Sequence, residues 1–288
     1  AIDIADGGYE VLLIEKDNHL GGHVKGLSTT FPRLQSPEIY INALVSRVQS
    51  HPHVKIYLNS EVEEVSGYVG SFIVRFKGET GALVGAIIAA TGYELLPRTR
   101  TPQFPIGPDI IDGLEYEKIV AVQKDGILHR PSDGKIPQNV VFIQCAGSRD
   151  TEHGMPYCSR ICCMYTAKQV MQYHQSVPEG QAYVCYMDIR SDAKGFEEFI
   201  QTVIAEQRVL YLRGNVSRVF RDGDKIKVWT VDTLADKNIE ISADMVVLAT
   251  AMVPSSGVRE LARKLNISLD SNGFLAEAHI KLRPVESL

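Results

Sequence analysis

Four of the chain's five cysteines lie within one segment of nineteen residues, and this cluster limits the kind of site that the fold can carry. They are Cys145, Cys158, Cys162 and Cys163, in the sequence QCAGSRDTEHGMPYCSRICCMYTAKQ of residues 144–169. Twelve residues separate the first two, three separate the next two, and the last two are adjacent. Four thiolates are the usual ligand set of a cubane iron–sulfur cluster, and the regular ferredoxin spacing is only one arrangement that supplies them.

The spacing also predicts local structure. Cys158 and Cys162 are four residues apart and would share one face of a helix, while Cys163 would point about 100° away from Cys162. A regular helix cannot aim all three at one group, so we expect a helix start or a turn near Cys162. Pro156 lies in a loop that leads to a helix beginning near Ser159. Cys145 arrives from the end of the preceding strand.

Three other interpretations of the cysteines stay open. Zinc sites with four cysteines are common but usually contain two C-x2-C pairs, which this sequence lacks. The thiols could instead be small apolar core residues. A disulfide between the adjacent Cys162 and Cys163 would be strained. The fifth cysteine, Cys185 in the apolar sequence AYVCYM, is expected to be a core residue.

The first residues indicate a nucleotide-binding fold. The sequence AIDIADGGYEVLLIEKD predicts the end of a helix, a turn at Gly7 and Gly8, and a buried strand from Glu10 to Ile14 that is closed by Glu15. In dinucleotide-binding folds such an acidic residue binds the ribose hydroxyls, and a glycine loop some 20 residues earlier holds the pyrophosphate. That loop would precede Ala1, so we expect the sequence to be a fragment of a longer flavoprotein.

Apolar strands divide the chain into two related halves. Strands are predicted at residues 54–58 and 61–65, followed by a hairpin over residues 70–94 whose last strand runs into Thr91 and Gly92. A similar strand ends at Ala249 and Thr250, and a strand from Asn139 begins the second half. The loop after that strand, residues 145–149, lacks the glycines that cradle a pyrophosphate, so a second dinucleotide is doubtful.

Composition excludes several classes of partner. The net charge is −5 with a pI near 5.9, and no run of five like charges occurs, so nucleic acid is not expected to bind. The longest apolar stretches are about half of the ~20 residues that cross a bilayer, so no direct membrane insertion is expected. We expect a soluble, cytoplasmic protein, and in that reducing compartment clustered cysteines bind metal or perform redox chemistry more often than they form disulfides.

A family resemblance joins these observations. The segments LIEKDNHLGGH, TFP, EVEEVSGYVGSF, QCAGSRD, PYCSRICCMYTAKQ, YMDIR and HIKLRPV resemble the iron–sulfur flavoprotein subunit of heterodisulfide reductases and its anaerobic relatives. The resemblance covers nearly the whole chain, and its most specific part is residues 144–169. It implies an α/β, two-domain FAD/NAD(P)-binding Rossmann-type fold like that of thioredoxin reductase, with FAD and one [4Fe-4S] cluster.

The resemblance also implies roles for particular residues. The cluster ligands would be the four clustered cysteines, and Lys168 would lie beside the flavin, where a cation could stabilise its reduced, anionic form. FAD would be held by Glu15, Lys16, Gly21, Gly22, His23, Val62, Thr91 and Gly92, and the family's C-terminal flavin contact would follow Leu288. Many relatives contain a further inserted ferredoxin-like segment with C-x2-C-x2-C runs, which this sequence lacks.

We therefore expect four regions and one function. Residues 1–100 would form the FAD domain, 101–137 a connection, 138–255 a second Rossmann-like domain with the iron–sulfur site, and 256–288 a return to the FAD domain. The expected function is electron transfer between flavin and cluster, with electron bifurcation left open. The partners would be other heterodisulfide-reductase-like subunits, ferredoxin or hydrogenase-type electron donors, and a second copy of the chain in a homodimer. The alternatives are a pyridine-nucleotide-disulfide oxidoreductase and a zinc-stabilised binding subunit without catalysis.

Overall fold

The computed structural model describes residues 1–123 and 125–287, which form two compact units. Unit 1 contains residues Ala1–Lys25, Glu38–Glu94 and Val253–Leu288. Unit 2 contains Gly26–Pro37 and Leu95–Met252. The segment 101–137, expected to be a connection, belongs to unit 2. The chain passes between the units at β6 (Tyr93–Leu95) and β15 (Met252–Pro254), which form a two-stranded sheet.

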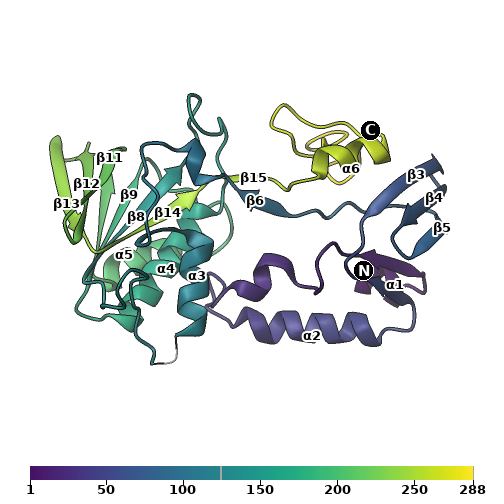
Figure 1. The fold of residues 1–288 in the computed structure, drawn as a ribbon, viewed down its shortest axis with the longest axis horizontal. Helices are drawn as coiled ribbons and strands as arrows, with labels where there is room; N and C mark the ends of the chain where they lie inside the picture. The colour runs from purple at the N-terminus through teal and green to yellow at the C-terminus, as the bar shows by residue number, and fades with distance from the viewer. Residues whose placement is uncertain (124, 288) are drawn as a thin grey trace. The chain divides into compact units, whose positions relative to one another are not determined.

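Unit 1 contains two small sheets (Figure 1). After α1 (Ile2–Asp6), strand β1 (Val11–Ile14) pairs in parallel with β2 (Val54–Tyr57), and η1 (Gly22–Gly26) and α2 (Pro37–Ser50) connect them. Strands β3 (Val62–Tyr68), β4 (Ser71–Phe76) and β5 (Glu79–Val84) form an antiparallel sheet, and α6 (Val258–Leu265) follows β15. The predicted N-terminal helix, the strand ending at Ile14 and the strands near residues 54 and 61 are confirmed.

One predicted strand is wrong. The hairpin's last strand ends at Val84, and residues 85–92 form no strand before β6 begins at Tyr93. The apolar sequence of this segment resembles a buried strand, but a strand is held by hydrogen bonds to a neighbouring strand. None of the described strands pairs with residues 85–92, and the Ile88 side chain is 71% exposed. Thr91 and Gly92 therefore lie in a loop.

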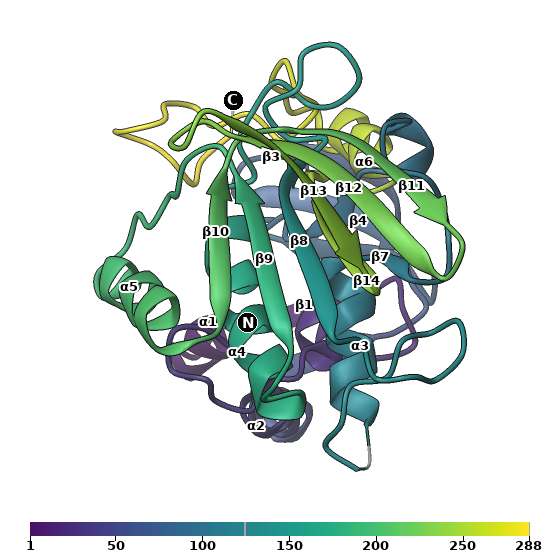
Figure 2. The same ribbon diagram turned by 90° about the vertical axis from the view of Figure 1, so that its left-hand side faces the viewer.

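Unit 2 is built on a parallel sheet of five strands in the order β10-β9-β8-β14-β7 (Figure 2). The strands are β7 (Ile110–Asp112), β8 (Asn139–Ala146), β9 (Gln181–Tyr186), β10 (Val209–Arg213) and β14 (Met245–Thr250). A short helix, η2 (Arg98–Arg100), precedes them. Strands β8 and β14 are almost continuously buried, as expected for parallel strands whose two faces are covered.

Different layers cover the two faces of this sheet. Helices α3 (Gly113–Val122), α4 (Cys162–Ser176) and α5 (Phe196–Glu206) pack on one face, where Tyr116, Phe142 and Tyr173 are fully or almost fully buried. An antiparallel sheet of β11 (Val216–Asp222), β12 (Lys225–Asp232) and β13 (Lys237–Ala243) packs on the other. The predicted strands that begin at Asn139 and end at Thr250 are confirmed, as is a helix before Val122. Cys185 lies in β9, 2% exposed, as expected of a core residue.

The helix expected near Ser159 begins three residues later, at Cys162. Arg160 has a φ of 69°, which an α-helix cannot contain, and the Ile161 N–H donates to the Ser159 carbonyl. The turn at Ser159–Ile161 therefore delays the helix and places Cys162 and Cys163 in its first turn. Within the described residues, no helix combines the length and the apolar character that crossing a bilayer requires.

Candidate functional site

The end of β8 turns sharply at Cys145. This residue has a φ of 55°, in the left-handed region that residues other than glycine rarely adopt. Gly147 follows with a φ of 80°, and a Cβ atom there would lie 2.6 Å from Leu96 Cδ2 and 2.9 Å from Thr101 Cγ2. Because only glycine fits this close approach, the strand end is fixed against its neighbours. The turn delivers Cys145 at the carboxyl end of the sheet, where α/β folds usually bind ligands.

The loop from Ser148 to Ile161 is held by its own hydrogen bonds. The Met155 N–H donates to the Gly147 carbonyl at 2.7 Å, and the Arg149 N–H donates to the Tyr157 carbonyl at 2.9 Å. The hydroxyls of Ser148 and Ser159 share a hydrogen bond of 2.8 Å. This folded loop occupies the position in which a dinucleotide-binding domain presents its glycine loop, and it brings Cys158 back toward the strand end.

Three of the four predicted ligands are in direct contact. The Cys162 side chain hydrogen-bonds to those of Cys145 and Cys163. Cys162 is 1% exposed and Cys163 is 3% exposed, in the first turn of α4. The structure thus joins the strand end to the helix start, as the spacing of the cysteines predicted.

The contacts divide the protons unequally among these thiols. The hydrogen bond from Cys162 lowers the pKa of Cys145, and it lowers the pKa of Cys163 to about 7. Hydrogen bonding to Cys145 and Cys163, together with burial, raises the pKa of Cys162 well above its usual value. The Arg190 N–H also donates to Cys163 Sγ at 3.4 Å and favours its thiolate. Two of the three thiols are therefore readily deprotonated, which a metal ligand requires.

Cys158 lies next to the same segment of chain. Its sulfur accepts a hydrogen bond from the Arg160 N–H at 3.3 Å, and it lines a hollow with Arg160 and residues 189–192. Arg190 of that segment contacts Cys163 through its N–H. The fourth predicted ligand is thus partly exposed at the edge of the group formed by the other three.

The donor set suits an iron–sulfur cluster better than a single ion. Among the described residues, no three His, Cys, Asp or Glu side chains are arranged to hold one metal ion. A cubane binds each cysteine through a different iron, so its ligands need not converge on one point. The neighbouring Gln144 amide supports this fit, because its Nε2 atom is buried without a hydrogen-bond partner beside Cys163. A buried donor facing thiols is suited to thiolate or sulfide acceptors.

Lys168 lies about one and a half turns along α4 from the cysteines, with its ammonium buried inside unit 2. Its Nζ atom is 2.8 Å from Glu117 Oε1, and it donates to the Thr29 carbonyl at 2.8 Å. Burial lowers the pKa of Lys168, and the charge of Glu117 opposes this shift. No sequence pattern indicated Glu117 as the partner of this lysine. The predicted position of Lys168 beside a flavin stays a prediction.

Several of the predicted flavin residues lie together in unit 1. Glu15 ends β1 and accepts a hydrogen bond from the Asp17 N–H at 3.0 Å. His23 Nε2 donates to the Tyr93 carbonyl at 2.8 Å, next to Gly92, and the two rings lie 4.9 Å apart. Gly21, with a φ of 113°, and Gly22, with a φ of 49°, lead into this contact. The structure therefore brings His23 and its glycine pair beside the loop that contains Thr91 and Gly92.

Glu94 was missed from the sequence. It accepts hydrogen bonds from the N–H and the hydroxyl of Ser256, at 2.8 and 2.7 Å, and these lower its pKa. The charges of Lys16 and His23 are close enough to lower this pKa further. No motif could reveal this group, because 162 residues separate Glu94 from Ser256. Val62 is placed at the start of β3, where its carbonyl accepts a hydrogen bond from Lys264 Nζ at 2.8 Å.

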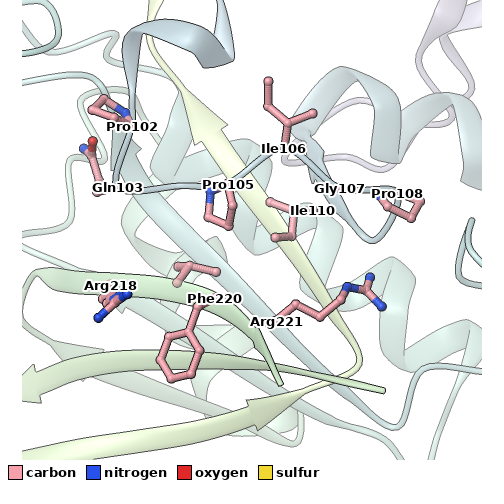
Figure 3. Close-up of a pocket in the computed structure, with 11 residues that line it drawn as sticks. Pro102, Gln103, Pro105, Ile106, Gly107, Pro108, Ile110, Arg218, Phe220 and Arg221 are labelled. Carbon is pink, nitrogen blue, oxygen red and sulfur yellow. The ribbon is translucent and has the colours of Figure 1, made fainter. Parts of the chain in front are cut away.

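A second hollow in unit 2 contains none of the predicted site residues. It has a volume of about 520 Å³ and lies between the proline-rich residues 102–110 and strand β11 (Figure 3). Arg221 at its edge pairs with Asp109 at 2.9 Å, and the Arg218 guanidinium lies 5.3 Å from the centre of the Phe220 ring. Its arginines are thus already in contact with neighbouring side chains of the same unit.

Comparisons with known proteins connect this geometry to a family. No protein-family model matches the chain. The H2:CoB-CoM heterodisulfide,ferredoxin reductase of Methanothermobacter marburgensis has a subunit that is 30% identical over 372 aligned positions, which cover 100% of this chain and 56% of that protein. The iron–sulfur subunit of the CoB–CoM heterodisulfide reductase of Methanocaldococcus jannaschii is 31% identical, with 100% and 57% covered. The chain is heterodisulfide reductase-like.

The heterodisulfide reductase-like chain spans just over half the length of these relatives. The alignments are also longer than its 288 residues, so the relatives contain residues that have no counterpart here. Among solved structures it is similar to the thioredoxin reductase of T. acidophilum, at a TM-score of 0.57 and 14% identity, with 98% of this chain and 81% of that one covered. For the Lactococcus lactis thioredoxin reductase the values are 0.58, 12%, 96% and 80%. The predicted α/β fold class is confirmed.

Proposed function

We propose that the chain is the electron-transfer part of a heterodisulfide-reductase-like oxidoreductase and that it passes electrons between FAD and one [4Fe-4S] cluster. The contact among Cys145, Cys162 and Cys163 at the meeting point of β8 and α4, with Cys158 at its edge, carries this proposal. The relatives named as heterodisulfide reductase subunits support the same chemistry.

The four cysteines would each bind one iron of the cluster, which supplies one-electron transfer when it is bound. The low pKa values of Cys145 and Cys163 prepare two of these ligands as thiolates, and Cys162 would lose its proton on ligation. The Arg190 N–H would continue to donate to Cys163 and fix the direction of its sulfur. The buried position of Cys162 and Cys163 would exclude water from one side of the site.

The flavin would be held by unit 1. Glu15 is suited to accept hydrogen bonds from ribose hydroxyls, and Gly21 and Gly22 let the backbone approach the ligand closely. The other residues proposed to line the FAD site are Lys16, His23, Val62, Thr91 and Gly92. The thioredoxin-reductase-like fold supports this assignment. In unit 2, Lys168 is proposed to lie toward the flavin on the same helix that carries Cys162 and Cys163.

The alternatives have less support. A zinc-stabilised binding subunit needs donors that converge on one ion, and the described residues contain no such group. A pyridine-nucleotide-disulfide oxidoreductase needs a redox cysteine pair beside the flavin and a phosphate loop in its second domain. The loop of residues 147–157 is folded on itself where that phosphate loop would lie.

The partners follow from the proposed family role. Other heterodisulfide-reductase-like subunits would receive the electrons, ferredoxin or hydrogenase-type proteins would supply them, and the chain would form a homodimer within the complex. A flavin exchanges one or two electrons and so could couple donors and acceptors of both kinds, including by electron bifurcation.

The test uses the full-length protein purified without oxygen. FAD and iron per chain are measured first, and the flavin is then photoreduced while the cluster is followed by rapid-freeze EPR. The proposal predicts that a reduced-cluster signal grows as flavin electrons are lost. Zinc in place of iron, or a cluster whose oxidation state does not respond to the flavin, would overturn it.

A further inference from the structure

Gln144 is the buried polar side chain closest to the cysteine group, and its hydrogen bonding is incomplete. It precedes Cys145 near the end of β8 and is 6% exposed. The Cys163 thiol donates to Gln144 Oε1 at 3.4 Å. Gln144 Nε2, at the other end of the same amide, is buried and has no partner. The amide therefore uses its acceptor on the thiol and leaves its donors unused.

This arrangement is adapted to only one protonation state of Cys163. A thiol can donate to the amide oxygen, whereas an iron-bound thiolate has no proton and can only accept. Once Cys163 binds iron, Oε1 would face an acceptor and lose its hydrogen bond. Both ends of the buried amide would then lack a partner, so the side chain gains by turning.

Turning the amide by half a rotation solves both problems. The oxygen and nitrogen of a glutamine amide have nearly the same shape, so they can exchange places without moving other atoms. Nε2 would then lie where Oε1 is now, within hydrogen-bond distance of Cys163 Sγ. The Arg190 N–H contacts the same sulfur from the segment after β9.

We propose that Gln144 is a reversible partner of Cys163, which accepts from the free thiol through Oε1 and donates through Nε2 to the sulfur when it is bound to the cluster. This inference rests on the proposed cluster and goes beyond it, since it assigns a residue that controls the cluster's potential. A hydrogen bond to a cluster sulfur withdraws electron density and stabilises the reduced, more negative state. Gln144 would therefore raise the reduction potential.

The test compares Gln144→Met and Gln144→Glu with the native full-length protein. Methionine keeps the length of the side chain but has no donor, and glutamate keeps the shape but replaces the NH2 group by an oxygen. The matched control is Gln123→Met, a glutamine with a buried, unpartnered Oε1 atom whose Nε2 donates to Ser176 Oγ at the far end of α4. Circular dichroism and iron per chain establish that each variant is folded and loaded.

The midpoint potential of the cluster is then measured by EPR-monitored redox titration. Both Gln144 variants should shift it to more negative values, and Gln123→Met should leave it unchanged. Pulsed EPR on native protein grown with 15N-glutamine should show a nitrogen coupling that Gln144→Met removes. Native potentials in loaded Gln144 variants, or an unchanged nitrogen coupling, would overturn the inference. A native protein without iron would instead refute the proposed function, and the assignment of Gln144 with it.

Discussion

Lys168 and Glu117 form an ion pair of 2.8 Å in which both side chains are 2% exposed. The pair joins α4 to α3, and the Glu117 carboxylate also accepts hydrogen bonds from the Ser28 hydroxyl at 2.7 Å and from Gln169 Nε2 at 2.9 Å. Lys168 in turn donates to the Thr29 carbonyl. The network therefore fixes residues 28–29 of unit 2 against both helices, independently of any cofactor.

Removing one partner of this pair should destabilise unit 2. Lys168→Met leaves the Glu117 carboxylate buried without its counter-charge, and we expect a loss of about 3–5 kcal/mol in the free energy of unfolding. Urea unfolding followed by circular dichroism measures the change. The control Lys194→Met removes an exposed lysine and should change the value by less than about 0.5 kcal/mol. Equal stability of the two variants would show that the pair is not maintained in solution.

Acid should remove a second contribution to stability. Hydrogen bonding to Arg130, whose Nε and Nη2 atoms lie 2.7 and 2.6 Å from the Asp133 carboxylate, lowers the pKa of Asp133. A depressed pKa in the folded state stabilises the protein above the unfolded pKa of about 3.9 and loses this effect as the pH falls through the folded value.

Asp133→Asn should therefore lower the melting temperature at pH 7, and the difference from native protein should shrink as the pH falls below about 4. Thermal melts at a series of pH values measure this. Glu179→Gln, at a 91% exposed residue paired with Arg208, is the control and should have little effect at any pH. A constant difference between Asp133→Asn and native protein down to about pH 2 would contradict the lowered pKa of Asp133.

FAD binding tests the role proposed for Glu15. In the full-length protein, Glu15→Ala should weaken binding by about 1–3 kcal/mol, because hydrogen bonds from ribose hydroxyls to a carboxylate are lost. Flavin retained after gel filtration, and the dissociation constant from fluorescence titration, report the loss. Glu63→Ala changes an exposed carboxylate on β3 and should bind FAD normally. If both variants retain FAD equally, Glu15 does not contact the ribose.

Pyridine nucleotides should not reduce this protein directly. The hydrogen bond from the Met155 N–H to the Gly147 carbonyl closes the loop after β8, so backbone N–H groups are not free to cradle a pyrophosphate there. Stoichiometric NADH or NADPH, added without oxygen, should leave the flavin absorbance unchanged, whereas dithionite should bleach it. Rapid bleaching by either nucleotide would contradict this interpretation of the loop.

The parts that the sequence predicted well are those set by local patterns. The continuous apolar residues of β8 and β14 predicted buried parallel strands, and the positions of Cys158, Cys162 and Cys163 predicted an irregular helix start. The start itself was placed three residues early, since nothing in the sequence distinguishes Arg160 as a residue with positive φ.

The missed features depend on contacts between distant residues. Residues 85–92 have the composition of a strand, but strand formation needs a neighbour, which the sequence does not reveal. Glu117 and Glu94 are acidic residues among many others, and their significance lies in partners that are far away along the chain. The orphaned donor of Gln144 is likewise visible only once Cys163 is placed beside it.

Iron content in cysteine variants tests the central claim most directly. The full-length protein is reconstituted without oxygen, and iron per chain and the broad absorbance near about 400 nm are measured for Cys145→Ser, Cys158→Ser, Cys162→Ser and Cys163→Ser, with Cys185→Ser as the matched buried control. Each of the four should lose iron and absorbance, because a cubane with three thiolates is labile or converts to a three-iron form, while Cys185→Ser should match the native protein. Full iron content after replacement of any one of the four, or zinc in the native protein, would contradict the account.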